Sequence, residues 1–463
     1  MSEEAIERPW IEGTSEGAPR PPFAKGLPLL GNMMAFVGDP LDTLRQEYER
    51  LGPIFRMKVP GQEWVVIAGV EANRLMIHAG SDLLVQGESY QGFNEAFDSK
   101  SFLITLDGPR QLHLRKVQQR AMGRAPLLAR FDEAVRLVDD VTRDWKEGDV
   151  IDAIPLLKRL VVRQLGVAVT SKDPTDLIDD VQTVLNHIVN VAQLKKWPKL
   201  VYKLPWYKNA KKHLLEDTRE LVAKHRGRTV DEALRDLVDD MLSATDVGGA
   251  PMQDETIWAA VSGAYMAGLD TAAITVAFAL HALLSTPDAL ERVRREVDEA
   301  FANGLPDAEA FQSLEALRGA TMETLRRYPV AALLTRDAAK DFVFHGHQVK
   351  KGDQILVGTG VAHFDPKLFP EPEKFDIDRF SAARSEHKQP GAYAPFGLGP
   401  HRCLGAGMGE LQTQIVVGRL LQQFELALEP DSRELHIVMK PLRRPETLRL
   451  RVVRRRQPLR AAA

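Results

Sequence analysis

The stretch from Trp258 to Ser285 (WAAVSGAYMAGLDTAAITVAFALHALLS) constrains the fold more than any other. It has 28 residues, and among them only Asp270 and His281 are expected to carry charge. A helix of this length could cross a bilayer. However, the stretch stands alone, it is rich in small and hydroxyl-bearing residues, and a carboxylate near the bilayer midplane would be costly. We therefore expect a long helix buried in protein, with the rest of the chain forming a core around it.

Length and composition fit one large body. The 463 residues contain no Pro/Ser/Gly-rich linker in their middle, and 44% hydrophobic with 27% charged residues is typical of a globular chain. The net charge of −3 predicts no general attraction to nucleic acid or to an anionic membrane. The single cysteine excludes an internal disulfide and fits a reducing compartment.

The two ends of the chain are expected to differ from its body. Residues 1–20 are charged and Pro-rich, with neither an apolar signal core nor an anchor, which predicts a disordered segment of a soluble, cytoplasmic protein. Residues 454–463 are expected to form a solvated basic tail after a last strand. The domain itself should span residues 21–453.

Local patterns place several elements. A short helix is expected at 41–51, and two strands joined at Pro60-Gly61 are expected within 54–69. Two short strands are expected within 342–357. The stretch 81–104 has an irregular pattern and is expected to be a loop.

The only cysteine, Cys403, lies in the string from Phe396 to Gly405 (FGLGPHRCLG). Glycines and a proline before it favour a tight loop, and apolar residues after it recur at helical spacing. A thiol at the start of a helix lies in the positive end of the helix dipole, which favours the thiolate, a good soft metal ligand. A lone cysteine is otherwise more often buried and structural. Here Gly397, Gly399 and Gly405 favour the ligand, because they remove side-chain bulk where a large flat group would lie.

This string resembles the haem-binding loop of the cytochrome P450 family, with Phe396, Gly397, Gly399, Arg402, Cys403 and Gly405 at matching positions. In that family the cysteine thiolate is the axial ligand of the haem iron. The resemblance implies haem b (iron protoporphyrin IX) as cofactor and Cys403 as its metal ligand. It also implies that Phe396 and Gly405 contact the haem and that His401 contacts a propionate. A loop histidine bonded to the backbone is the alternative for His401.

The long apolar helix carries a second match to the family. Ala267, Gly268, Asp270 and Thr271 fit its oxygen-binding motif, Ala/Gly-Gly-x-acid-Thr. Gly268 would permit close approach of a flat cofactor, and the Thr271 hydroxyl could bond a preceding carbonyl and open the helix locally. The resemblance gives Asp270 and Thr271 the catalytic task of delivering protons to oxygen. Alternatively, Asp270 pairs with a distant arginine in the resting state.

Two arginines match the family's propionate-binding positions. Arg115 lies on a helix expected to start at Asp107-Gly108-Pro109. Arg336 follows a segment expected to line the pocket, although a plain surface charge is the alternative. Gln111 stands where the family commonly has histidine, so its contact with a propionate is left open. His113 would face elsewhere on the helix.

A third match involves Glu323, Arg326 and Arg379. The first two are three residues apart on one helix face, and pairs of this kind are mostly surface features of little energetic value. Arg379 follows in the Pro-rich segment FPEPEKFDIDRF. This order resembles the buried Glu-Arg-Arg network of the family, whose role is to hold the cysteine loop.

Substrate contacts are less specific. In the family the loop that corresponds to 81–104 covers the substrate, although loop aromatics that only pack on the core would look the same. The residues expected in the pocket are Phe93, Phe97, Phe102, Gly263, Ala264, Ala332, Leu333 and Leu334.

The segment 194–213 is basic and aromatic and contains no acidic residue. This pattern is typical of a nucleic-acid patch or of a membrane-surface segment. In the family it falls at the hinge between two helices that cover the pocket, and a solvated face is a further alternative. The residues concerned are Lys195, Lys196, Lys199, Lys203, Lys208, Lys211 and Lys212, with Trp197, Tyr202, Trp206 and Tyr207.

Taken together, the resemblance implies a mainly α fold with small β-sheets, as one large domain with haem buried between two long helices. The implied activity inserts one oxygen atom from O2 into a lipophilic small molecule of terpenoid, steroid or fatty acyl type. Because no flavin region is visible and one cysteine cannot hold an iron–sulfur cluster, electrons should come from a ferredoxin or flavodoxin with an NAD(P)H-dependent reductase. Arg402, Lys116 and Arg120 could present a basic face to it.

Two other functions stay open on the sequence. A peroxide-using haem-thiolate enzyme would be expected to lack the acid–alcohol pair that is present here. A non-enzymatic haem sensor would need no proton relay. Neither a nucleic-acid partner nor a transmembrane anchor is expected.

Overall fold

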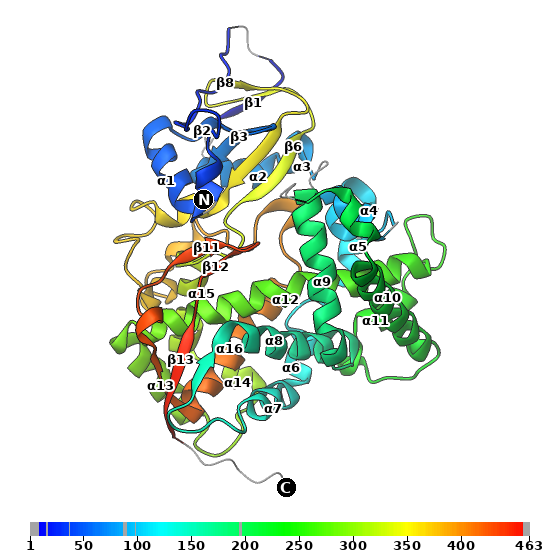
Figure 1. Cartoon of the computed structure of the whole chain (residues 1–463), viewed down its shortest axis with the longest axis vertical. Helices are drawn as coiled ribbons and strands as arrows, with labels where there is room; N and C mark the ends of the chain where they lie inside the picture. Colours follow the sequence, from blue (N-terminus) through cyan, green and yellow to red (C-terminus); the bar gives the residue numbers. More distant parts are fainter. Residues whose placement is uncertain are drawn as a thin grey trace.

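The long apolar helix, α12 (Asp254–Leu284), runs through the middle of the molecule (Figure 1). The computed structural model describes residues 9–14, 17–36, 38–86, 90–97, 99–193 and 197–456. Of the 31 residues of α12, 23 are buried. In the described ranges it is the one helix long and apolar enough to cross a membrane, and 72% of its most apolar window is buried inside the protein. Burial of this kind is expected of the central helix of a folded domain.

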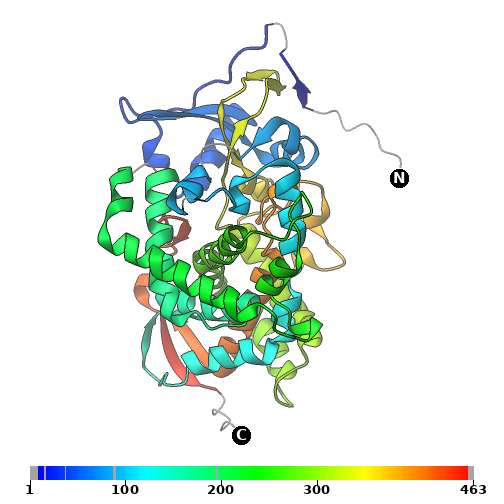
Figure 2. The ribbon, with the colours of Figure 1, turned by 90° about the vertical axis from the view of Figure 1, so that its right-hand side faces the viewer.

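Most of the other helices surround α12 in the larger, lower part of the molecule, whereas α1, α2 and α3 lie beside the strands at the top (Figures 1 and 2). Short 3₁₀ turns join several of them, and a π-helical turn follows α9 at Val189–Gln193. Their bounds are α1 Pro40–Leu51, α2 Gly69–His78, α3 Gly80–Leu83, α4 Gln91–Phe97, α5 Gly108–Gln118, α6 Ala125–Ala129, α7 Phe131–Val141, α8 Ala153–Thr170, α9 Ile178–Ile188, α10 Pro205–His225, α11 Leu237–Ser243, α13 Pro287–Ala300, α14 Ala308–Gln312, α15 Glu315–Arg327 and α16 Ala406–Gln423.

The largest sheet has five strands in the order β2-β3-β9-β6-β4, and only the β3–β9 pair is parallel. Its β2–β3 hairpin turns at Pro60-Gly61, where Gly61 adopts a φ of 77° that favours glycine. The strands of this sheet are β2 Ile54–Val59, β3 Gln62–Ala68, β4 Leu84–Val85, β6 Leu334–Ala338 and β9 Gln354–Gly358.

Three smaller sheets lie elsewhere in the described part of the chain. Their orders are β1-β7-β8, β10-β13-β5 and β11-β12. The strands are β1 Trp10–Glu12, β5 Val150–Asp152, β7 Phe342–Phe344, β8 His347–Val349, β10 Phe424–Leu428, β11 Ile437–Met439, β12 Arg443–Pro445 and β13 Arg449–Arg455.

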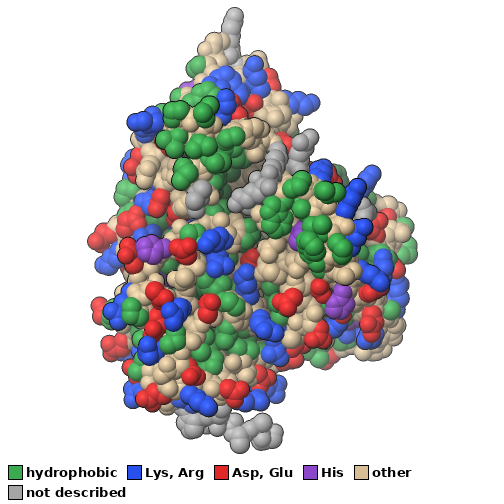
Figure 3. Space-filling view, viewed as in Figure 1, with side chains coloured by type: hydrophobic (Ala, Val, Ile, Leu, Met, Phe, Trp, Pro, Cys, Tyr) green, Lys and Arg blue, Asp and Glu red, His purple; other side chains and the backbone are tan. Residues whose placement is uncertain are grey.

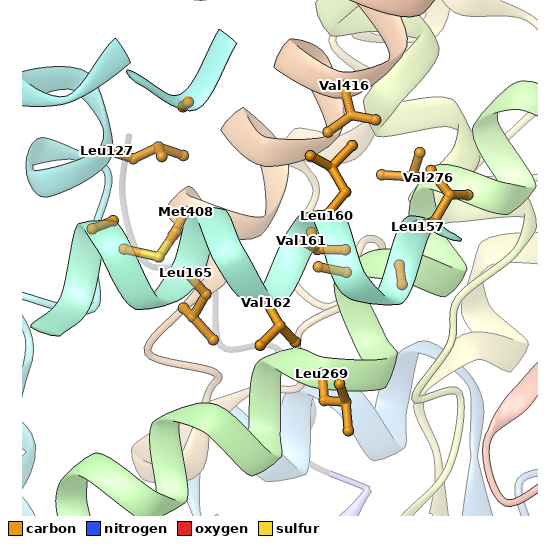
Figure 4. Packing of buried hydrophobic residues seen from close by; sticks show 14 of the residues in the cluster. Leu127, Leu157, Leu160, Val161, Val162, Leu165, Leu269, Val276, Met408 and Val416 are labelled. Atoms are coloured by element: carbon orange, nitrogen blue, oxygen red, sulfur yellow. The ribbon is translucent and has the colours of Figure 1, made fainter. Parts of the chain in front are cut away.

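The main core forms where α8 lies between α12 and α16 (Figure 4). Leu160 and Val162 of α8 and Leu269 of α12 are at most 1% exposed. Burying a side chain of this size stabilises a fold by about 1.5–3 kcal/mol, so this packing is a main source of stability. The mainly α fold with small sheets that the sequence predicted is confirmed.

Two parts of the body differ from the local predictions. The stretch 81–104 contains the short helix α4, because Phe93 and Phe97, four residues apart, both face the core, 8% and 9% exposed. The stretch 342–357 contains three strands rather than two, since β9 joins the five-stranded sheet while β7 and β8 pair with each other.

The expectation for both ends of the chain was partly wrong. Near the start, β1 pairs with β7, Trp10 stacks on His78 at 6.4 Å between ring centroids, and Arg20 donates to Asp353. These contacts order part of a segment expected to be disordered; residues 1–8, 15 and 16 lie outside the described residues.

At the other end, β13 extends to Arg455, and its arginines have protein partners instead of forming a solvated tail. Arg454 donates to Glu425 at 2.6 Å, and Arg456 donates to Asp298 at 2.7 Å. A run of arginines can therefore end the central strand of a small sheet when acidic side chains lie nearby. Residues 457–463 lie outside the described residues.

The contact between α15 and the 3₁₀ turn Ile377–Phe380 yields a stability prediction. A Cβ added at Gly319 would overlap the carbonyl oxygen of Ile377, whereas a Cβ added at Gly409 of α16 would meet no atom within 4 Å. Overpacking costs typically about 1–3 kcal/mol, so Gly319→Ala should lower the melting temperature. Gly409→Ala should raise the melting temperature slightly, because alanine reduces the conformational entropy of the unfolded chain, which stabilises the fold by roughly 0.4–1 kcal/mol. Thermal unfolding of the two variants checks this, and shifts in the same direction would contradict it.

Candidate functional site

One face of α12 is accessible in the middle of the fold. Ala267 is exposed, and Gly263, Gly268 and Thr271 are partly exposed, although most of the helix is buried. Residues 263, 267 and 271 are four apart and therefore lie on one face. An accessible face on a core helix borders an open space inside the fold.

The Cys403 loop is a second accessible feature within the fold. Gly399–His401 forms a 3₁₀ turn, the Cys403 amide donates to the Phe396 carbonyl at 2.9 Å, and α16 begins at Ala406 with Gly405 as its N-cap. Cys403 is accessible to water, yet burial raises the pKa of its thiol. Both observations hold if the sulfur faces an enclosed space rather than bulk solvent.

The direction of this pKa shift corrects part of the sequence analysis. Burial raises the pKa of the Cys403 thiol, and the Gly405 amide with the charges of Arg115 and Arg402 lowers it only in part. The start of α16 therefore does not by itself produce a thiolate. A coordinated metal cation deprotonates a thiol outright, so the loop fits a metal ligand whose thiolate forms on binding.

The three glycines of the cysteine loop are required for different physical reasons. Gly397 and Gly399 have φ values of 68° and 70°, and a Cβ at Gly399 would lie 2.5 Å from the carbonyl oxygen of Met76. Backbone conformation and packing thus require them, which corrects the interpretation that only a flat ligand would. At Gly405 the neighbour of an added Cβ is the Cys403 sulfur at 3.9 Å, so here the open side is toward the sulfur.

Two buried or half-buried arginines lie near this loop without a carboxylate partner. Among the described residues, neither Arg115 nor Arg336 has an ion pair, and Arg336 is 3% exposed. Burial lowers the pKa of Arg336, and Tyr90 and Asp107 offset this in part. A buried guanidinium lacking a counter-charge is suited to an anionic group. The two arginines and the Cys403 sulfur therefore fit haem, which carries two propionates and an iron.

His401 is engaged by the protein itself. Its Nδ1 lies 2.9 Å from the Gln86 side-chain amide nitrogen, and its Nε2 lies 2.8 Å from Asp107 Oδ1. With both ring nitrogens occupied, His401 positions the loop against Asp107, at the start of α5, and Gln86, after β4. This differs from both sequence interpretations, a propionate contact and a bond to the backbone.

Gln111 also bonds to the cysteine loop. Its amide donates to the Pro400 carbonyl at 2.9 Å and it is 1% exposed. The contact ties α5 to the loop, so Gln111 serves the loop in this structure rather than a propionate. His113 faces elsewhere, with its Nε2 2.7 Å from the Thr245 carbonyl.

On α12, the acid and the alcohol of the motif have different surroundings. The Thr271 hydroxyl donates to the Ala267 carbonyl at 2.8 Å on the accessible face. Asp270 is 2% exposed, and its Oδ1 lies 2.5 Å from Lys158 Nζ of α8. Lys158 also donates to Gln182 of α9 at 2.9 Å. Asp270 is thus paired in the resting state, with a lysine and not an arginine.

The need for glycine at position 268 has a different cause from the one expected. A Cβ at this position would overlap the Leu165 side chain of α8. The glycine lets α8 and α12 approach each other, and close approach of a cofactor does not explain it. Ala267, the neighbouring residue, is the one on the accessible face.

The Glu323, Arg326 and Arg379 side chains form one buried ion network, and each is 0% exposed. Arg326 donates to Glu323 at 2.7 Å and 2.8 Å, and Arg379 donates to Glu323 at 3.1 Å. The remaining guanidinium hydrogens go largely to backbone carbonyls of residues 363 and 370–374. From the sequence alone, the pair Glu323 and Arg326 would be expected on the surface. In the structure it is fully buried and connects α15 to the Pro-rich segment.

His363 links this network to the cysteine loop, and sequence analysis missed it. Burial lowers its pKa to about 3, so the imidazole is neutral. One ring nitrogen donates to the Arg326 carbonyl at 2.9 Å, and the other accepts the Ala394 amide at 2.8 Å. Ala394 lies two residues before Phe396, which accepts from Cys403. A lone histidine without a motif offers no signal that would have identified this role.

The expected pocket residues fall into two groups. Phe102 packs on Phe93 and Phe97 at ring-centroid distances of 6.0 Å and 4.9 Å, and a Cβ on Gly263 would lie 3.7 Å from Phe102. These aromatics therefore cover α12 near its accessible face, and Ala264 beside them is buried.

The second group follows α15. Ala332 is 2% exposed and belongs to the core under α1, β2 and β3, so it is a packing residue and its assignment to the pocket is corrected. Leu333 packs at the edge of the same core. Leu334 is partly buried and lies beside Gly397 of the cysteine loop.

Another buried cluster was not expected from the sequence: His225, Asp236 and Asp239 lie close enough for a metal site. Arg228 already donates to both aspartates, at 2.8 Å and 2.5 Å. Burial would raise the pKa of Asp236, but bonds from His225 and Ser171 outweigh it and lower the pKa to about 2. The cluster has its own cation and joins α10 to α11 without a metal.

The ion network leads to a prediction for Glu323→Gln. The change leaves two buried guanidinium groups without their shared carboxylate, and breaking a buried pair typically costs about 3–5 kcal/mol. Denaturant unfolding should show a loss of this size, or the variant should fail to fold. The matched control is Glu446→Gln, whose partner Lys440 lies 3.3 Å away with both side chains about half exposed or more. That change should cost about 0–1 kcal/mol, and equal effects would contradict the analysis.

Comparisons with known proteins agree with this geometry. The family described as Cytochrome P450 matches residues 21–452. Cyclooctat-9-en-7-ol 5-monooxygenase of Streptomyces melanosporofaciens is 26% identical over 439 residues, which is 92% of each chain. Sterol 14alpha-demethylase of Mycobacterium bovis is 26% identical over 417 residues, 87% of this chain and 91% of the relative.

Solved structures show the same fold. The heme domain of cytochrome P450DA superposes with a TM-score of 0.84 at 20% identity, over 95% of this chain and 98% of that one. Retinoic acid bound cyanobacterial CYP120A1 gives 0.81 at 23% identity, over 94% and 99%. With the family match over nearly the whole chain, the protein belongs to the cytochrome P450 family and is a haem-dependent monooxygenase.

Proposed function

We propose that this monooxygenase oxidises a lipophilic small molecule of terpenoid, steroid or fatty acyl type, with electrons from a separate ferredoxin or flavodoxin and its NAD(P)H-dependent reductase. The observation that carries the proposal is the accessible face of α12, which presents Thr271 next to the buried Asp270 and has an apolar cover beside Gly263. Two relatives, one named a cyclooctat-9-en-7-ol 5-monooxygenase and one named a sterol 14alpha-demethylase, support the terpenoid and steroid classes.

The proposed cover is apolar. Phe93, Phe97 and Phe102 lie over α12 beside Gly263 and bring no charge to the space. A substrate there would lose water from its apolar surface without leaving a polar group unpaired. These residues would bind by size and shape, which suits a rigid polycyclic or long-chain molecule.

The cofactor would be held from three sides. Cys403 would ligate the iron, and Arg115 and Arg336 would pair with the propionates, with Phe396, Ala267 and Gly405 as further contacts. Haem supplies activation of O2 when it is bound. His401 and Gln111 would keep the cysteine loop in register with α5, because both are bonded across that junction.

Proton delivery would depend on Asp270 and Thr271. The Thr271 hydroxyl stands on the accessible face and could donate there after it leaves the Ala267 carbonyl. Asp270 is buried and paired with Lys158, so it could take up protons from the side of α8 and pass them to the Thr271 region. The acid–alcohol pair favours this function over a peroxide-using enzyme, and the relay favours it over a haem sensor.

Thr271→Ala should uncouple the enzyme. Without the hydroxyl, the reductase system should still consume NAD(P)H and O2, but product formed per NAD(P)H should fall severalfold. Product analysis together with NAD(P)H consumption measures this ratio, after spectral titration with lipophilic compounds has identified a ligand. An unchanged ratio would remove Thr271 from the proposed relay.

Two controls separate this result from loss of the cofactor. The reduced Thr271→Ala protein should keep the red-shifted carbon monoxide absorption of haem-thiolate ligation. Cys403→Ser should lose it. If Cys403→Ser kept that absorption, the proposed iron ligand would be wrong.

Arg402 and Lys116 are exposed near the cysteine loop and could attract an acidic redox partner. Arg120, the third residue expected on this face, instead donates to Asp240 at 3.0 Å and 2.7 Å, which neutralises its charge. The proposed docking face therefore depends on Arg402 and Lys116.

Lys116→Glu should slow reduction by ferredoxin severalfold at low ionic strength, because a rim charge mainly affects the association rate. The difference should shrink as salt screens the charge. Stopped-flow reduction at two salt concentrations checks this, with Lys146→Glu, at the turn after α7, as control. Equal rates for both variants would exclude this face as the docking site.

A further inference from the structure

A groove of about 560 Å³ lies along α13, next to Arg456, where the chain leaves β13. Figure 1 shows α13 and the lower end of β13 beside each other at the lower left. Another face of α13 is engaged with the rest of the fold. There Glu296 accepts two backbone amides at the start of α15, at 3.0 Å and 2.9 Å, and Arg292 donates to Asp378 at 2.9 Å and 2.7 Å. The groove therefore belongs to a face that is separate from these contacts.

Arg294 of α13 lines the groove, and two of its guanidinium nitrogens have no partner. Its Nε and Nη2 are buried and donate no hydrogen bond to any residue that the structure describes. Burial lowers the pKa of Arg294, and the positive charges of Arg456 and Arg454 lower it as well. Glu425 and Asp298 offset this shift in part. A buried charged donor without an acceptor is costly, so this guanidinium is suited to a further acceptor.

The two carboxylates near Arg294 are already bound to other arginines. Arg456 donates to both oxygens of Asp298, at 3.1 Å and 2.7 Å. Arg454 donates to Glu425 at 2.6 Å. Three guanidinium groups thus share two carboxylates, which leaves one positive charge without a counter-charge among the described residues of this cluster.

The unpartnered nitrogens form the edge of the guanidinium that binds a carboxylate through two parallel hydrogen bonds. The same pair, Nε and Nη2, holds a carboxylate elsewhere in this protein. Arg326 donates to Glu323 through it at 2.7 Å and 2.8 Å, and Arg419 donates to Asp139 at 2.6 Å and 2.8 Å. Arg294 presents this edge with no described carboxylate against it. The edge is therefore available for two oxygens of one anion.

The surface around the groove has no single sign of charge. Figure 3 shows acidic and basic side chains mixed over the lower left of the molecule, where α13 lies in Figure 1. Glu291 and Glu299 also line the groove, but both are exposed, so water and salt screen their charge. Long-range attraction would contribute little to an anion bound here, and the buried donors of Arg294 would supply the affinity.

We propose that this groove is a binding site for an oxyanion, a phosphate or carboxylate group, with Arg294 as the main donor and Arg456 and Arg295 beside it. A planar guanidinium matches the spacing of two oxygens in either group. Pro287 and Leu290 line the same groove and would contact an apolar part of the molecule that carries the anion. The site is separate from the one that holds Cys403, and it would bind a ligand of different chemistry.

Equilibrium dialysis of the full-length, haem-loaded protein tests the proposal, with radiolabelled phosphate in one arm and radiolabelled succinate in the other, at constant ionic strength. At least one of these anions should bind saturably to a single site, and which one binds identifies the group that the site takes. Arg294→Gln should weaken this binding about tenfold or more, because hydrogen bonds to a charged group are lost. The matched control is Arg159→Gln, an exposed arginine of α8, which should bind like the wild type.

Thermal unfolding separates an anion site from an arginine that only supports the fold. In chloride, Arg294→Gln should melt at or above the wild-type temperature, because it removes a buried charge that has no partner. At saturating concentration of the bound anion, the wild type should melt higher than the variant, because only the wild type gains stability from binding. A general effect of the salt on the solvent would act on both proteins equally.

Three results would overturn the proposal. The first is binding that does not saturate, or no binding of either anion. The second is saturable binding that Arg294→Gln keeps. The third is a melting temperature of Arg294→Gln that lies below the wild type by the same amount in chloride and in the bound anion, because Arg294 would then only support the fold.

Discussion

The structure around the cysteine depends on one buried carboxylate. Glu323 is fully buried and is shared by Arg326 and Arg379, which also hold the carbonyls of the Pro-rich segment before the cysteine loop. Taking three charges out of water is costly, and only complete hydrogen bonding makes it tolerable. The benefit is geometric: each guanidinium fixes several backbone groups at once. Through neutral His363 and the Ala394 amide, this rigidity reaches the residues that precede Cys403.

At the sulfur, burial and charge act in opposite directions. Burial raises the pKa of the Cys403 thiol, and the Gly405 amide and the nearby arginines offset it only in part. The cysteine loop therefore suits a metal ligand that becomes a thiolate when it binds the metal. The same reasoning applies to Arg336, whose buried guanidinium lacks a carboxylate partner in the described part of the chain. Cofactor binding would relieve both costs, which predisposes the fold to its prosthetic group.

On the other side of the open space, α12 combines two kinds of neighbour. The space that a side chain at position 268 would need is filled by Leu165 of α8, so Gly268 lets α8 and α12 pack closely. Helix α8 also supplies Lys158, which pairs with Asp270. Lys158 also donates to Gln182 of α9, so Asp270 is connected through one lysine to the helix that leads into the turn before α10. A movement of α9 would therefore change the surroundings of the Asp270 carboxylate through Lys158.

The sequence by itself determined the elements with strong local signals: the buried central helix, the β2–β3 hairpin, the helix after Cys403 and the family to which their motifs belong. These follow from hydrophobic period, turn residues and motif spacing, which act over a few residues. Only the tertiary structure decided what each side chain meets. The lysine partner of Asp270, the role of Gly268 against α8, the bonds of His401 and Gln111 and the link through His363 join residues far apart in the chain. Their geometry depends on how helices pack, and a single sequence carries no local trace of that.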